Sequence, residues 1–146
     1  MSKTTSTLAP FAAVLLGLGV AIWFLVSQGW AVGWWLLSAF LVAHGVVHIL
    51  FVVPDRAELA TIGKRVGLTS GEMQSIGTVL GAVVVFGFLF AGLATLLGSG
   101  WWGLLVAVSA VASAAMLGLF FSPQLVLGLG IDAVLLFVVV SGVWHP

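Results

Sequence analysis

The sequence has no cysteine, no tyrosine and very little charge: four basic and four acidic residues in a chain of 146. The missing cysteines exclude a thiol nucleophile, a disulfide and a thiolate metal site. Charged residues make up 5% of the chain, whereas soluble domains carry about 25%. Such a composition excludes a soluble enzyme and a disordered segment, and without a run of basic residues we expect no nucleic-acid partner.

Apolar residues, at 62% of the chain, form five runs that are each close to the length of a membrane-spanning helix. A bilayer core requires about 20 apolar residues in helical conformation. The four prolines all lie at the edges of these runs, where they break no helical hydrogen bond. The sequence therefore predicts an all-α membrane protein, a single polytopic domain over residues 1–146. Its five transmembrane helices should cover about 10–27, 31–53, 76–97, 101–121 and 125–144.

The connections and the basic residues predict the topology. Three connections are very short, so consecutive helices should be antiparallel neighbours. Lys3, Arg56, Lys64 and Arg65 all fall on the side of the N-terminus. By the positive-inside rule we expect a multi-pass protein of the cell membrane, with a cytoplasmic N-terminus, an external C-terminus and the lipid bilayer as its partner.

The one long connection, between the second and third spans, carries helix signals of its own. Residues 57–66 favour a short helix in the cytoplasmic interface, which Gly67 can close. Thr69 and Glu72 then have the spacing of a capping box that opens the third span.

Three ionisable residues fall inside the spans: His44, His48 and Asp132, which we call the polar cluster. The four-residue spacing of the histidines places both imidazoles on one helix face. Counted from the cytoplasmic ends of the spans, His48 lies about 8 Å deep, Asp132 about 10 Å and His44 about 14 Å. Ionisable residues inside a membrane tend to pair. We therefore expect His48 and Asp132 to make contact, directly or through one water or ion.

The polar cluster suits more than one chemistry. Two histidines and an aspartate are a plausible ligand set for a divalent ion such as Zn²⁺, Fe²⁺ or Ni²⁺. The same groups can relay protons, or simply clamp two helices together. We expect no haem, because His44 and His48 on one helix face cannot ligate opposite faces of one porphyrin. The favoured function is a small membrane protein that binds a metal ion or exchanges protons here, alone or within a larger membrane complex.

Two further patterns suggest contacts with lipid or with other proteins. Tryptophans at the outer helix ends predict an aromatic belt at the membrane interface. Gly77 and Gly81 have the spacing that allows close helix packing, within the chain, with a membrane-protein partner or in a homo-oligomer. These features leave two alternatives: an accessory subunit without chemistry, or a membrane enzyme for a lipid-soluble substrate with Asp132 as acid or base. The tryptophans of the predicted belt are Trp30, Trp34, Trp35, Trp101, Trp102 and Trp144, and Trp23 lies near it.

The predicted orientation can be tested by labelling single cysteines with a membrane-impermeant thiol reagent. Because every Lys and Arg lies on one side, a cysteine at Ser70 should react only from the cytoplasm, and one at Ser99 only from outside. The natural chain has no cysteine and provides the blank. Reaction of Ser99→Cys from the cytoplasmic side would overturn the topology.

Overall fold

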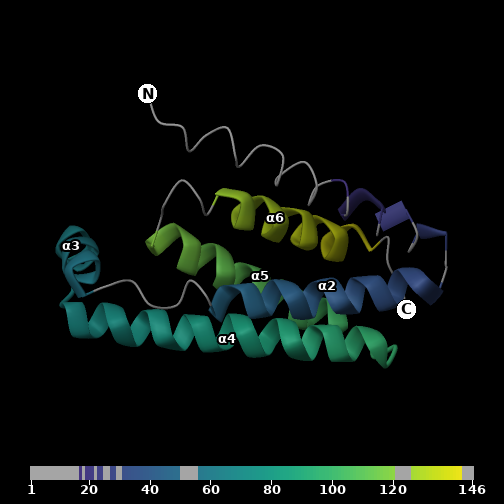
Figure 1. Ribbon diagram of the computed structural model, residues 1–146, viewed down its shortest axis with the longest axis horizontal. Helices are drawn as coiled ribbons and strands as arrows, with labels where there is room; N and C mark the ends of the chain where they lie inside the picture. The colour runs from purple at the N-terminus through teal and green to yellow at the C-terminus, as the bar shows by residue number, and fades with distance from the viewer. Residues whose placement is uncertain are drawn as a thin grey trace.

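The computed structural model of the chain describes residues 17, 19–21, 23–24, 27–28, 31–49, 56–120 and 126–142 (Figure 1). In this part of the chain the regular structure is entirely helical, as the sequence predicts. The first predicted span, about 10–27, lies largely outside the described residues. The helices are α2 (Ala31–Ile49), α3 (Arg56–Val66), α4 (Ser70–Leu96), α5 (Trp102–Leu119) and α6 (Val126–Ser141).

Three of these helices, α2, α4 and α5, are long and apolar enough to cross a membrane. Helix α6 is also apolar but has 16 residues, which at 1.5 Å per residue extend about 24 Å and fall short of a core of about 30 Å. The described residues thus confirm the all-helical fold, and three of the five predicted spans are helices long and apolar enough to cross a membrane.

The predicted signals at the ends of α3 and α4 are confirmed. Helix α3 ends at Val66, and Gly67 follows with a φ of 75°, a left-handed conformation that glycine adopts without strain. Thr69 caps α4 through a complete capping box: its hydroxyl oxygen accepts from the Glu72 backbone N–H, and the Glu72 carboxylate accepts from the Thr69 N–H. This box supplies partners for N–H groups that the first turn would leave unbonded.

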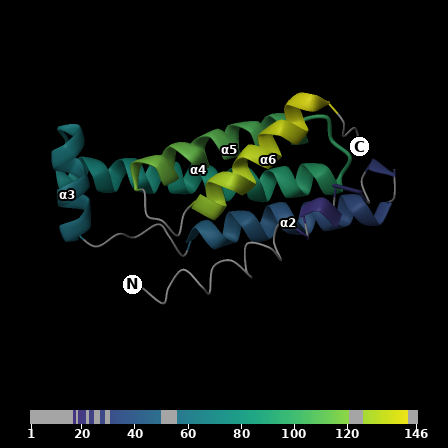
Figure 2. The ribbon, with the colours of Figure 1, turned by 90° about the horizontal axis from the view of Figure 1, so that it is seen from above.

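Helix α4, the longest, organises the packing. It packs against α2 and α5, α6 packs against α5, and α3 packs against α4. The chain runs back and forth along the long axis of the molecule, while α3 lies across one end (Figures 1 and 2). The main core forms where α2, α4, α5 and α6 meet; its buried members include Leu41, Val84, Phe88, Val106 and Leu135.

Glycines set the distance between α4 and its two neighbours. A Cβ atom on Gly92 would lie 2.9 Å from the Ser38 carbonyl oxygen of α2, and one on Gly45 would lie 2.9 Å from Phe88 Cβ of α4. On the other contact, a Cβ on Gly87 would overlap Ser109 of α5. Such separations are shorter than side chains tolerate, so the helices approach this closely only because glycine stands there.

The Gly92 contact predicts a stability difference between two glycine substitutions. Gly92→Ala should lower the free energy of unfolding by about 1–3 kcal/mol, because the added methyl group meets backbone as well as the Val42 side chain. The matched control is Gly118→Ala on α5, where a Cβ has nothing within 4 Å, and we expect it to be neutral or slightly stabilising. Denaturant titration of the two purified variants measures the difference; equal midpoints would contradict the proposed close approach.

Candidate functional site

The two histidines of the polar cluster lie on one buried face of α2, as their spacing predicts. His44 is 7% exposed and His48 is 3% exposed. Their ring centroids are 4.8 Å apart and the ring planes are nearly perpendicular. Both rings also lie near Phe88 of α4, whose centroid is 4.8 Å from that of His44. The imidazoles therefore belong to the core of the bundle.

Asp132 reaches this face from α6 and makes its contact with His44. The His44 Nε2 atom lies 3.1 Å from Asp132 Oδ1. A single proton bonds the two atoms, either as Nε2–H donating to the carboxylate or as a carboxyl O–H donating to the ring nitrogen. The direct partner of Asp132 is thus His44, one helical turn before the expected His48. A contact with His48 through one water or ion stays a prediction.

The described helix bounds agree with this pairing. The predicted second span extends to residue 53, whereas α2 is described to Ile49. Counted from the observed bounds, His44 lies about 8 Å from the end of α2 and Asp132 about 9 Å from the start of α6. These two residues are therefore level with each other, and His48 lies closer to the helix end.

His48 has different partners, and one of them was not anticipated. Its Nδ1 atom lies 2.8 Å from the carbonyl oxygen of His44, and its Nε2 atom lies 2.8 Å from Ser113 Oγ on α5. Ser113 was not among the residues singled out from the sequence. The available signal was its hydroxyl group in a mostly apolar helix, but Ser109 on the same helix carries the same signal.

These bonds weaken the metal interpretation of the polar cluster. Both ring nitrogens of His48 are engaged by protein oxygens, so this imidazole has no lone pair directed at an ion shared with His44 and Asp132. In the described part of the chain, no group of three or more His, Cys, Asp or Glu side chains is placed to hold a metal ion. The expected Zn²⁺, Fe²⁺ or Ni²⁺ site therefore has no support in the structure.

Within the polar cluster, Asp132 is the residue whose charge is most costly to bury. The residue is fully buried, and its second carboxyl oxygen, Oδ2, has no hydrogen-bond partner among the described residues. An ionised carboxylate can accept about four hydrogen bonds, yet here only Oδ1 has a partner. A buried charge with so little compensation is costly, and Oδ2 is the atom at which a proton would remove that cost.

Aromatic rings enclose His44 on its other sides. The Phe40 ring is stacked on it, with centroids 5.9 Å apart and planes 5° from parallel, and Phe88 meets it edge to face. An aromatic face within about 6 Å attracts a cation. This surrounding is therefore compatible with an imidazolium as well as with a neutral ring.

The tryptophans of the predicted belt divide into two groups. Trp35 and Trp101 are 65% and 68% exposed. Trp34 and Trp102 instead pack against each other edge to face, with centroids 5.9 Å apart, and Trp102 is buried. Trp30 and Trp144 lie outside the residues whose side chains are described. The belt stays a prediction, but two of its members also close one end of the core.

The predicted glycine pair lies within the bundle of this chain. Gly77 and Gly81 are both buried on α4. A Cβ on Gly77 would lie 3.1 Å from the Phe120 ring at the end of α5. The tighter approaches occur at Gly45, Gly87 and Gly92, which the search for a four-residue glycine spacing did not single out.

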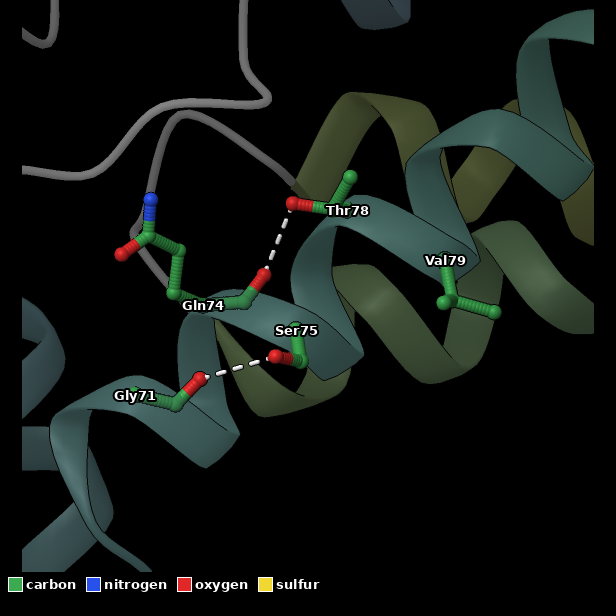
Figure 3. Close-up of a pocket in the computed structure, with 5 residues that line it drawn as sticks. All are labelled: Gly71, Gln74, Ser75, Thr78 and Val79. Carbon is green, nitrogen blue, oxygen red and sulfur yellow. Dashed lines mark hydrogen bonds between the residues drawn. The ribbon is translucent and has the colours of Figure 1, made fainter.

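A shallow, open hollow on the first turns of α4 is separate from the polar cluster (Figure 3). Two of its hydroxyl groups are already used along the helix: Ser75 donates to the Gly71 carbonyl at 3.0 Å, and Thr78 donates to the Gln74 carbonyl at 2.8 Å. These bonds use the hydrogen of each hydroxyl group. It is lined by Gly71, Gln74, Ser75, Thr78 and Val79.

The described fold and site define the class of the molecule: a helical protein with three helices long and apolar enough to span a membrane and a buried histidine–aspartate pair. Comparison of the chain with models of known protein families, with curated protein sequences and with solved structures finds no match. The function must therefore be argued from the site itself.

The direct contact predicts energetic coupling between His44 and Asp132. His44→Ala and Asp132→Ala should each lower stability, and the double variant should lose less than the sum, with a coupling energy of about 0.5–3 kcal/mol. A second cycle with His48→Ala and Asp132→Ala is the control, and its coupling should be smaller because these side chains have no direct bond. Denaturant titration in detergent gives both cycles. A larger coupling for His48 than for His44 would contradict the structure.

Proposed function

We propose that this chain is a small multi-pass protein of the cell membrane that takes up and releases a proton at its buried His44–Asp132 pair. The observation that carries this proposal is the Asp132 carboxyl group. It is fully buried in an apolar bundle, with one oxygen bonded to an imidazole and the other without a partner among the described residues. Ionisable residues in such a position are costly to retain and mark functional sites by default.

The pair has two ways of holding one proton. In one, His44 is an imidazolium bonded to the Asp132 carboxylate at 3.1 Å. In the other, the proton resides on the carboxyl group, and both partners are neutral. The two forms differ only in which of the two bonded atoms, His44 Nε2 or Asp132 Oδ1, carries the proton. The unpartnered oxygen of Asp132 is the open position where a proton would arrive.

The same proposal includes the five-span topology with a cytoplasmic N-terminus and an external C-terminus. Lys64 and Arg65 at the end of α3 are exposed, on the side of the bundle where α4 begins. The turn between α4 and α5, on the opposite side, contains no basic residue. This charge difference supports the proposed orientation.

An enzyme for lipid-soluble substrates receives less support. Ser113 and His48 are at the distance of a nucleophile and its base, but Ser113 is fully buried. The aspartate contacts the other histidine, so the residues do not form a serine–histidine–aspartate triad. Proton exchange requires no substrate cavity. It needs only the His44 imidazole and the Asp132 carboxyl group, which are already in contact.

Infrared difference spectroscopy of the protein in lipid bilayers tests the proposal. On changing the pH across the neutral range, the wild-type protein should gain and lose the carbonyl band of a protonated carboxyl group, and Asp132→Asn should lack this change because an amide cannot ionise. The control Glu72→Gln removes an exposed carboxylate of the capping box and should keep the band.

The other functions give different results in the same preparations. If Asp132 keeps one protonation state throughout, the pair is a clamp between helices, as expected for an accessory subunit. In that case the double variant His44→Leu with Asp132→Leu should be at least as stable as the wild type. A stoichiometric metal found by elemental analysis, and lost in His48→Ala, would instead restore the metal interpretation.

A further inference from the structure

The two bonds of His48 determine which of its nitrogens carries a hydrogen. The carbonyl oxygen of His44 can only accept, so the Nδ1 atom 2.8 Å away must be the donor. In a neutral imidazole the other nitrogen, Nε2, is then an acceptor. The Ser113 hydroxyl at 2.8 Å must therefore donate its hydrogen to Nε2.

This arrangement prevents His48 from passing a proton onward. A relay histidine accepts a proton on one nitrogen and releases the hydrogen of the other to a base. The hydrogen on Nδ1 points at an amide carbonyl oxygen, which is no base and leads to no further group. The acceptor nitrogen faces a serine hydroxyl that is itself fully buried.

The neighbouring helices bring few charges to this ring. Helix α5 has no ionisable residue, α4 has only Glu72 in its exposed first turn, and α6 has only Asp132. On its own helix, His48 faces His44 at 4.8 Å between ring centroids. A second imidazolium at that separation would be repelled by the first, and the carboxyl group that could offset the repulsion is bonded to His44.

We propose that His48 is a positioning residue, held as the neutral Nδ1–H tautomer by the His44 carbonyl oxygen and the Ser113 hydroxyl, which confines the exchangeable proton to His44 and Asp132. This inference rests on the proposed proton exchange. It adds that the whole site takes up and releases one proton. The fixed His48 ring packs edge to face on His44 and holds that imidazole against the carboxyl group.

Solid-state ¹⁵N NMR of the full chain in lipid bilayers, with labelled histidine, tests the tautomer directly. Each histidine follows a different residue type, namely Ala43, Val47 and Trp144. Labelling the carbonyl carbon of valine therefore selects His48, and labelling that of alanine selects His44. We expect hydrogen on Nδ1 and none on Nε2 for His48, and hydrogen on Nε2 for His44 whenever Asp132 is ionised.

Variants of Ser113 test the role of the hydroxyl. Ser113→Ala should shift the His48 Nε2 resonance toward that of an acceptor without a hydrogen bond, and Ser113→Thr, which keeps a hydroxyl, should preserve the wild-type position. The matched control is Ser109→Ala, one turn earlier on the same helix, whose hydroxyl donates to the Leu105 carbonyl instead. The wild-type tautomer itself is measured whether or not these variants fold.

The outcomes separate this inference from the proposed function. Hydrogen on His48 Nε2, or a His48 imidazolium while Asp132 still changes its protonation, would overturn the positioning role and leave proton exchange intact. A fixed Nδ1–H tautomer beside an Asp132 that never changes protonation would overturn proton exchange, and with it the confinement of an exchangeable proton. A fixed tautomer with a titrating Asp132 supports both.

Discussion

The burial of one carboxyl group in an apolar helical bundle is the constraint around which the other polar contacts are arranged. Asp132 is fully buried on α6. Although α2, α4 and α5 carry several buried polar side chains, among the described residues His44 is the partner that bonds to its carboxyl group. The single imidazole that reaches it, His44, thus determines both the charge that the interior can hold and how α6 meets α2.

The polar contacts extend from that pair across the bundle. Asp132 on α6 contacts the His44 ring on α2, the His44 carbonyl accepts from His48, and His48 accepts from Ser113 on α5. Three helices are linked in this way. Each of these bonds joins a different pair of chemical groups. The sequence therefore contains no repeated motif from which the set of contacts could be predicted.

The sequence shows which ionisable residues form the site more readily than it shows which of them pair with each other. Ionisable residues in an apolar run and the four-residue spacing of the histidines are visible in the chain itself. The choice between His44 and His48 depends on where α2 ends, and apolar runs define helix ends poorly. Ser113 was missed because a serine in a helix commonly bonds its own preceding turn, as Ser109 does. Helices that are apolar all round also give no periodic stripe from which their packing could be predicted.

The close contacts at Gly45, Gly87 and Gly92 have a mechanical consequence. Where backbone meets backbone or a short side chain, no flexible group can absorb a displacement, so α2, α4 and α5 are expected to move together as one rigid body. Helix α6 packs on α5 differently, through the side chains of Leu117 and Val139 against Gly128 and Gly103. Such side chains can change rotamer. The stiffness of the molecule is thus expected to be uneven, and the carboxyl group lies on a helix that packs on α5 through side chains able to change rotamer.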